Sequence, residues 1–278
     1  MAAERSVIVG GHELTIAEAG VGGRPLLLVH GFTGAKEDFV DFLGDFADEG
    51  WWAVAPDLRG HGASAKPDAE EHYSLATFAT DVLGLADLLG WDGFALLGHS
   101  MGGMIAQEIV LRAPGRVQRL VLMDTCHGPV EGLDPEMVAM GMEILRTQGL
   151  DVLLELLDSM AGERTPSEER VRAEREGYIE FGDRKLADSS PAMYAAMASE
   201  LVGRDDRIGE LAGLEVPTLV VVGEEDANFV GPSRRMAAAI PGAELVVIPD
   251  ASHCPQFEHP EAWWAAVAPF LAGGQAAG

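Results

Sequence analysis

The chain has 278 residues, of which 47% are hydrophobic, so it can build a sizeable core in one large α/β domain or two small ones. Its 19 basic and 45 acidic residues give a formal charge of −26, which repels phosphate backbones and anionic lipids and so disfavours nucleic-acid and membrane partners. Two cysteines are too few for a disulfide framework, and the N-terminal residues lack the pattern of a signal peptide, so we expect a cytoplasmic protein.

Short β-rich runs alternate with helical patterns along most of the chain. The predicted strands are residues 6–9, 12–18, 25–29, 52–55, 93–97, 117–123, 218–222 and 244–248. The predicted helices between the later strands are residues 37–49, 75–89, 101–112, 234–239 and 260–271. The first two strands form an antiparallel hairpin around Gly10 and Gly11, and the later ones are unbroken apolar runs. This alternation predicts an α/β protein with a mostly parallel, eight-stranded sheet flanked by helices.

One long segment interrupts this alternation after the sixth strand. From about residue 126 to residue 216 there are only helical patterns, at 134–148, 150–161, 167–181 and 192–201. Six of the eleven methionines lie here. They either fill helix cores or line an adaptable apolar pocket, and on the second interpretation Met137 and Met140 are candidate substrate-binding residues. A helical insertion at this point predicts a cap over the carboxyl edge of the sheet.

The strongest local signal is the sequence Gly-His-Ser-Met-Gly at residues 98–102, between an apolar strand and an apolar helix. A serine on such a tight turn is held above the sheet, and the flanking glycines avoid collisions with the neighbouring strand and helix. The backbone N–H of Met101 begins the helix, where unpaired donors favour an oxyanion. We therefore predict that Ser100 is a nucleophile.

A nucleophilic serine needs a base, and His253 is the best placed of the eight histidines. It follows the last strand by five residues, so a parallel sheet brings it to the same edge as Ser100. His99 is expected to point away into the packing, and His30 and His61 are interpreted as residues that order their loops.

The base in turn needs a carboxylate that fixes its tautomer. Asp226 follows the seventh strand at the same edge and gives the chain order Ser, Asp, His. Asp124, which follows the sixth strand, is the rival acid. A second oxyanion donor is expected from the glycine-flanked loop 30–34, where the N–H of Phe32 is the candidate and its ring would lie over the acyl group.

Together these residues resemble the α/β-hydrolase superfamily, and most closely its small capped esterases, enol-lactonases, C–C hydrolases and cofactor-free haloperoxidases. Five motifs occur in order over nearly the whole chain: residues 30–34, 57–64, 98–102, 223–226 and 253–260. The resemblance implies a core of residues 1–125 and 214–278 with a cap of residues 126–213, and a structural role for the loop 57–64. Serine in place of aspartate at the nucleophile position argues against the dehalogenase and epoxide hydrolase branches.

These observations predict a serine hydrolase that cleaves a small to medium, largely apolar ester or lactone through an acyl-enzyme on Ser100, without a metal or organic cofactor. The alternatives are a C–C bond hydrolase, a haloperoxidase or perhydrolase with the same triad, and a small-molecule receptor. The acidic chain disfavours anionic substrates unless arginines such as Arg204 or Arg207 offset the field. The oligomeric state, monomer or homodimer, is left open.

Overall fold

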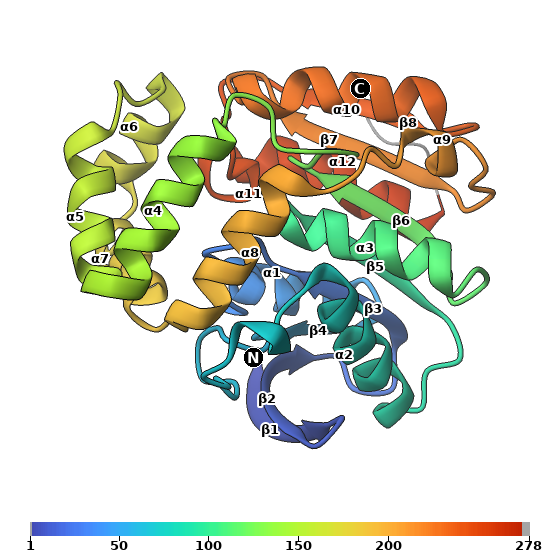
Figure 1. Ribbon diagram of the computed structural model, residues 1–278. Helices are drawn as coiled ribbons and strands as arrows, with labels where there is room; N and C mark the ends of the chain where they lie inside the picture. Colours follow the sequence, from blue (N-terminus) through green and yellow to red (C-terminus); the bar gives the residue numbers. More distant parts are fainter. Residues whose placement is uncertain (1, 274–278) are drawn as a thin grey trace.

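The computed structural model describes residues 2–273 and contains one eight-stranded sheet (Figure 1). The strands are β1 (Ala3–Val9), β2 (His12–Ala19), β3 (Arg24–Val29), β4 (Trp51–Pro56), β5 (Phe94–His99), β6 (Val117–Met123), β7 (Thr218–Gly223) and β8 (Glu244–Ile248). Their order across the sheet is β1-β2-β4-β3-β5-β6-β7-β8, and β2 alone runs opposite to the others. The predicted fold class is confirmed.

Helices cover both faces of the sheet, which explains why its central strands are apolar without alternation. On one face, α1 (Glu37–Asp48) and α12 (Pro260–Ala272) pack Phe39, Phe46 and Trp263 into a fully buried cluster. On the other face lie α2 (Leu75–Leu88), α3 (Met101–Arg112) and α10 (Ala227–Ala239). This arrangement leaves the carboxyl ends of the parallel strands as the edge where loops can meet.

The helical insertion follows β6, as predicted. It contains α4 (Pro135–Gln148), α5 (Leu150–Met160), α6 (Pro166–Glu174), α7 (Tyr178–Ala187), α8 (Pro191–Gly203) and α9 (Ile208–Leu211). In Figure 1, α4 to α7 gather at the left of the view, and α8 runs from them toward α3 at the centre. The backbone enters and leaves side by side, because Val130 N–H donates to Leu201 O at 3.0 Å and Arg207 N–H donates to His127 O at 2.8 Å.

Several side chains fasten the insertion to the loops at the strand ends. The Glu225 carboxylate accepts from the backbone N–H of Ser167 in the first turn of α6 at 3.0 Å. The Lys185 ammonium on α7 lies 2.6 Å from Asp38 Oδ1 on α1, and both side chains are largely buried. These contacts hold α6 against the loop that follows β7, and α7 against the first turn of α1.

The structure differs from the prediction in the helices more than in the strands. The predicted helix 167–181 is two helices, because Gly177 adopts φ +75° between α6 and α7. Helix α10 begins at Ala227, seven residues earlier than predicted, and tolerates Pro232 in its interior. Three short helices were not predicted: η1 (Glu70–His72), α9 and α11 (Pro255–Glu258). Within residues 2–273, none of the helices has both the length and the apolar character that crossing a bilayer requires.

Candidate active site

Ser100 lies in a strained turn between β5 and α3. Its backbone has φ 56° and ψ −119°, a conformation that costs of order 1–3 kcal/mol in a non-glycine residue. The turn is held because Ser100 N–H donates to Met123 O at 2.8 Å on the neighbouring strand. A Cβ atom on Gly98 would lie 2.2 Å from Gly102 O, and one on Gly102 would lie 2.1 Å from Val29 O. Both glycines are therefore required by close backbone approach, as the motif predicted.

Three side chains from distant parts of the chain form a continuous hydrogen-bonded series. His253 Nε2 lies 3.0 Å from Ser100 Oγ, and His253 Nδ1 lies 2.7 Å from Asp226 Oδ2. Asp226 is 7% exposed, whereas the His253 side chain is 35% exposed. The buried carboxylate fixes Nδ1 as the protonated nitrogen, so that Nε2 faces the serine hydroxyl as an acceptor. The structure thus brings together the three residues that we selected as nucleophile, base and acid.

The loop that carries His253 is held on two sides. The carbonyl oxygen of His253 accepts from His99 Nε2 at 2.7 Å, and the Phe229 ring lies 4.8 Å from the imidazole between ring centroids. One residue earlier, Ser252 N–H donates to the Glu258 carboxylate. Burial and the nearby Glu168 raise the pKa of Glu258 to about 7. The imidazole is therefore oriented by more than its bond to Asp226.

The loop after β3 lies directly beside the serine, as expected of an oxyanion loop. A Cβ atom on Gly31 would lie 3.1 Å from Ser100 Cβ. The Phe32 carbonyl oxygen accepts from His61 Nε2 at 2.7 Å, and the Phe32 ring contacts the Tyr194 ring of α8 at 4.6 Å between centroids. These contacts fix the peptide whose N–H was predicted to bind an oxyanion. The second predicted donor is the N–H group of Met101, the first residue of α3.

Three other histidines near the site are structural groups. Burial lowers the pKa of His30 to about 4 and the pKa values of His61 and His99 to about 3, so all three rings are neutral near pH 7. His30 Nε2 accepts from Leu58 N–H at 3.0 Å and its Nδ1 donates to Gly31 O at 2.8 Å. Their low pKa values and their bonds to loop backbone are consistent with the loop-ordering role expected for His30 and His61.

Asp124, the rival acid, lies beside the triad rather than in it. It is fully buried, and its Oδ1 accepts from Gly223 N–H at 2.8 Å. Within the described part of the chain, Asp124, Asp226 and His253 are the three residues whose ligand atoms, all within 4.8 Å of one another, could hold a metal ion. A metal bound there would have to displace the bond between Asp226 and His253.

The insertion contributes residues that sequence analysis did not select. On α7, the Tyr178 ring packs edge-on against the Phe257 ring at 5.7 Å between centroids, and Lys185 pairs with Asp38. Burial raises the pKa of the Cys254 thiol well above its usual value, which keeps it protonated. Tyr178 and Lys185 are seven residues apart, the spacing of one helix face, but nothing in that spacing identifies the surface that the face covers.

The two methionines proposed as substrate contacts lie on α4 with much of their side chains in solvent. Met137 is 47% exposed and Met140 is 61% exposed. The buried methionine of this helix is Met142, which packs with Tyr194. Of the three substrate-binding candidates, Phe32 is the one that belongs to the loop beside Ser100.

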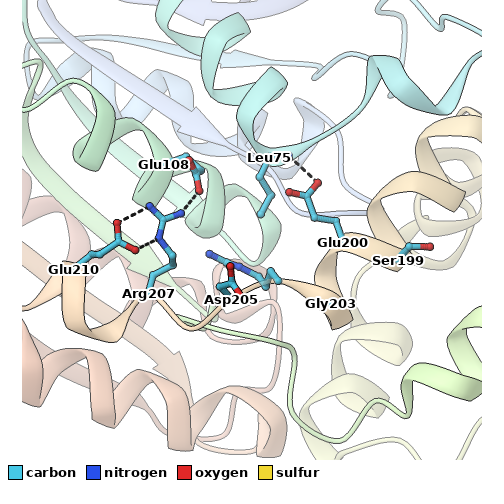
Figure 2. A pocket seen from close by; sticks show the side chains of 9 residues that line it. Leu75, Glu108, Ser199, Glu200, Gly203, Asp205, Arg207 and Glu210 are labelled. Atoms are coloured by element: carbon cyan, nitrogen blue, oxygen red, sulfur yellow. Dashed lines mark hydrogen bonds and ion pairs between the residues drawn. The ribbon is translucent and has the colours of Figure 1, made fainter.

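A cavity of about 600 Å³ lies away from the triad, between α3, α8 and α9 (Figure 2). It is lined by Arg204 and Arg207, the two arginines named above as candidates to offset the acidic field. Arg207 is engaged by Glu108 and by Glu210, whose Oε2 it approaches to 3.0 Å. Arg204 shares the cavity with Glu200, whose pKa burial raises. These arginines therefore do not lie at the nucleophile.

Residues 24–260 match the model of a protein family described as alpha/beta hydrolase fold. A 2-hydroxymuconate semialdehyde hydrolase of Pseudomonas putida is 31% identical over 276 residues, covering 96% of this chain and 94% of that protein. The structure of an enol-lactonase from Burkholderia xenovorans is similar with a TM-score of 0.82 at 25% identity, covering 96% of this chain and 99% of that one. The structure of a thermophilic esterase from Thermogutta terrifontis, 28% identical with a TM-score of 0.80, covers 98% of each chain.

Proposed function

The chain belongs to the α/β-hydrolase fold family, and within it we propose a serine hydrolase that cleaves a small to medium, largely apolar carboxylic ester or lactone. The observation that carries this proposal is the series of contacts from Ser100 Oγ to His253 Nε2 at 3.0 Å and from His253 Nδ1 to Asp226 Oδ2 at 2.7 Å. Such a series makes a hydroxyl nucleophilic at neutral pH.

In the proposed acylation step, His253 Nε2 takes the proton of Ser100 as Oγ bonds to the substrate carbonyl carbon. The negative charge that develops on the carbonyl oxygen is met by the backbone N–H groups of Phe32 and Met101, and one such donor contributes about 10²–10³ in turnover. The imidazolium, stabilised by Asp226, then gives its proton to the leaving alkoxide as the carbon–oxygen bond breaks. A lactone keeps its alcohol attached, but the bonds that form and break are the same.

In the second step, His253 removes a proton from water, whose oxygen attacks the acyl carbon of the Ser100 ester. The carboxylic acid leaves and Ser100 regains its proton from the imidazolium. These steps require neither a metal nor an organic cofactor. Replacing Asp226 with Asn should lower turnover by about 10⁴, because the amide favours the wrong tautomer of His253.

The preference for an apolar acyl group is supported by what lies beside the serine. Phe32 and Tyr194 form an aromatic contact there. The cation that α7 brings to this region, Lys185, is already paired with Asp38 at 2.6 Å. The formal charge of −26 adds a field that opposes anionic substrates. The boundaries of the cap, residues 126–213, and the cytoplasmic location stay predictions.

The proposal is tested with a fluorophosphonate probe and a panel of p-nitrophenyl esters and lactones of graded chain length. We expect the wild type to be labelled and active, Ser100→Ala to be neither, and Ser159→Ala, which alters an exposed serine of α5, to behave as the wild type. An unlabelled, inactive wild type that a small molecule stabilises against heating would instead support a receptor.

Hydrolysis of a carbon–carbon bond is the second candidate. The 31% identical relative is named as the hydrolase of a semialdehyde, and a semialdehyde is not an ester. The same triad would serve, with a carbanion as the leaving group in place of an alkoxide. Comparing kcat/KM for a vinylogous diketone with that for short esters separates the two candidates. A preference of several hundredfold for the diketone would overturn the esterase proposal.

A further inference from the structure

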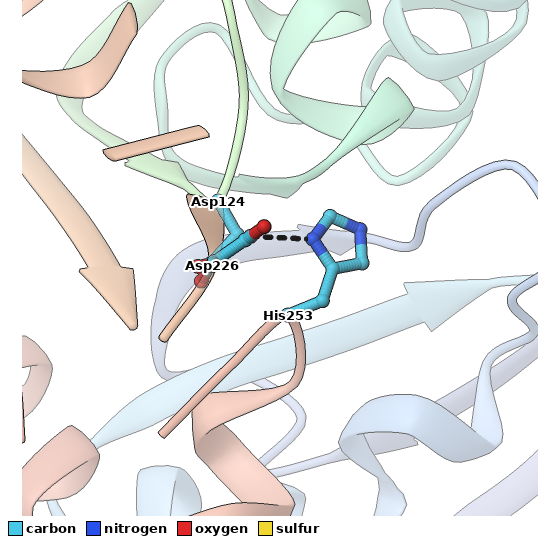
Figure 3. Close-up of side chains that lie close together, drawn as sticks. All are labelled: Asp124, Asp226 and His253. Carbon is cyan, nitrogen blue, oxygen red and sulfur yellow. Dashed lines mark hydrogen bonds and ion pairs between the residues drawn. The ribbon is translucent and has the colours of Figure 1, made fainter. Parts of the chain in front are cut away.

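A second carboxyl group lies buried against the triad acid, and the proposed reaction does not use it. Asp124 follows β6, is fully buried and adopts φ +44°. Figure 3 shows its side chain beside that of Asp226, which in turn faces the His253 ring. The two carboxyl groups come from the ends of adjacent strands, β6 and β7, so this proximity is built into the sheet.

The hydrogen bonds around Asp124 leave one of its oxygens without a donor. Oδ1 accepts from Gly223 N–H at 2.8 Å, whereas no N–H or hydroxyl group of the described residues reaches Oδ2. An oxygen of the Asp124 carboxyl group nevertheless lies within 4.8 Å of an oxygen of Asp226. Two buried carboxylates this close repel each other, and since both are acceptors, a hydrogen bond between them requires a proton on one of the two.

The surroundings decide which carboxyl group carries the proton. Asp226 faces the imidazole of His253, which favours the charged carboxylate, while Asp124 faces one neutral backbone N–H. Burial and the charge of Asp226 raise the pKa of Asp124 well above its usual value. Glu258 and Cys254, which both follow β8, also act on this region and supply no positive charge, whereas Lys185 of α7 acts on Cys254 and is paired with Asp38.

We propose that Asp124 is a positioning residue that stays protonated and donates a hydrogen bond from Oδ2 to the Asp226 carboxylate. The inference rests on the proposed function of the triad. By accepting from both His253 and Asp124, Asp226 becomes a weaker base and stabilises the imidazolium less. His253 therefore remains available as a base to a lower pH than it would with Asp226 alone.

The experiment compares Asp124→Asn with Asp124→Ala by the pH dependence of kcat/KM on a p-nitrophenyl ester. Asparagine can accept from Gly223 N–H and donate to Asp226, so D124N should lose no more than about tenfold and keep the acid limb of the profile. D124A lacks the donor, and its acid limb should move to higher pH by about one unit. A loss of about 10⁴ in D124N, or an unmoved acid limb in D124A, would overturn the proposal.

A second measurement does not depend on turnover or on the folding of D124A. The difference infrared spectrum at pH 7, wild type minus D124N, should contain the C=O stretch of a protonated carboxylic acid, shifted in D₂O. If that band is absent, Asp124 is ionised and the inference is wrong. If the band is present but the wild type hydrolyses none of the esters, the proposed function is wrong, whereas the conclusion that Asp124 is protonated still holds.

Discussion

Gly102 offers the most quantitative prediction, because its backbone approaches β3 more closely than any side chain would allow. In Gly102→Ala the added Cβ would lie 2.1 Å from Val29 O and 2.6 Å from His30 O. Both neighbours are backbone atoms, and Cβ atoms essentially never come within 3.0 Å of another heavy atom. The N-terminus of α3 must therefore move away from β3 by about 1 Å, with Ser100 and Met101 N–H at its end.

A displacement of about 1 Å at the reacting groups costs about 10² in rate, and the overpacking costs about 1–3 kcal/mol in the free energy of unfolding. We expect both losses in p-nitrophenyl ester hydrolysis and in urea unfolding. Gly44→Ala is the matched control: it lies in α1 with open space around its Cβ position, so it should keep activity and gain about 0.5–1 kcal/mol. Wild-type turnover and stability in Gly102→Ala would refute this account of the serine turn.

Three further predictions concern groups around the site. Glu258→Gln keeps an acceptor for Ser252 N–H but removes a carboxyl whose pKa is raised to about 7, so that the folded protein holds this proton more tightly than the unfolded chain does. The free energy of unfolding of the wild type should therefore fall more steeply than that of the variant as pH rises from about 4.5 to 7. Parallel dependences on pH in urea unfolding would contradict this. Lys185→Met strands the buried Asp38 and should cost about 3 kcal/mol by thermal unfolding, whereas Asp38→Asn combined with Lys185→Met should cost less; equal losses would mean that the charge is not what matters. Asp226→Asn should lower kcat by about 10⁴ without a comparable loss of stability, and near-wild-type kcat would move the role of triad acid to Asp124.

The fold and the order of the site residues were predictable because both follow from buried strands. Apolar runs end where the backbone leaves the sheet, so residues after β5 and β7 had to meet at one edge. The start of β1 was the largest strand error: it begins at Ala3, where residues 3–6 are exposed and pair through their backbones with β2, which leaves no apolar pattern to detect. The prediction of a single helix at 167–181 was wrong for a similar reason. Gly177 divides this segment into two helices, although the hydrophobic pattern on its two sides does not change.

The contacts of the insertion were not predictable from local patterns. Lys185 and Asp38 are 147 positions apart, and each belongs to a charged helix face that would ordinarily be solvated. Asp124 shows a different limit. Sequence reasoning treated it and Asp226 as alternatives for one role, whereas the structure holds both carboxyl groups side by side, each with its own hydrogen-bond partners.

The paired entry and exit of the helical insertion have an evolutionary consequence. The two ends of the insertion are joined by backbone hydrogen bonds, Val130 with Leu201 and His127 with Arg207. Because these ends lie side by side, the insertion is attached to the sheet in the same way as a long loop. Helices can be lengthened, shortened or exchanged there while the serine turn and its histidine keep their geometry. Substrate preference can thus change through the helical insertion while the loops at the carboxyl edge of the sheet stay the same.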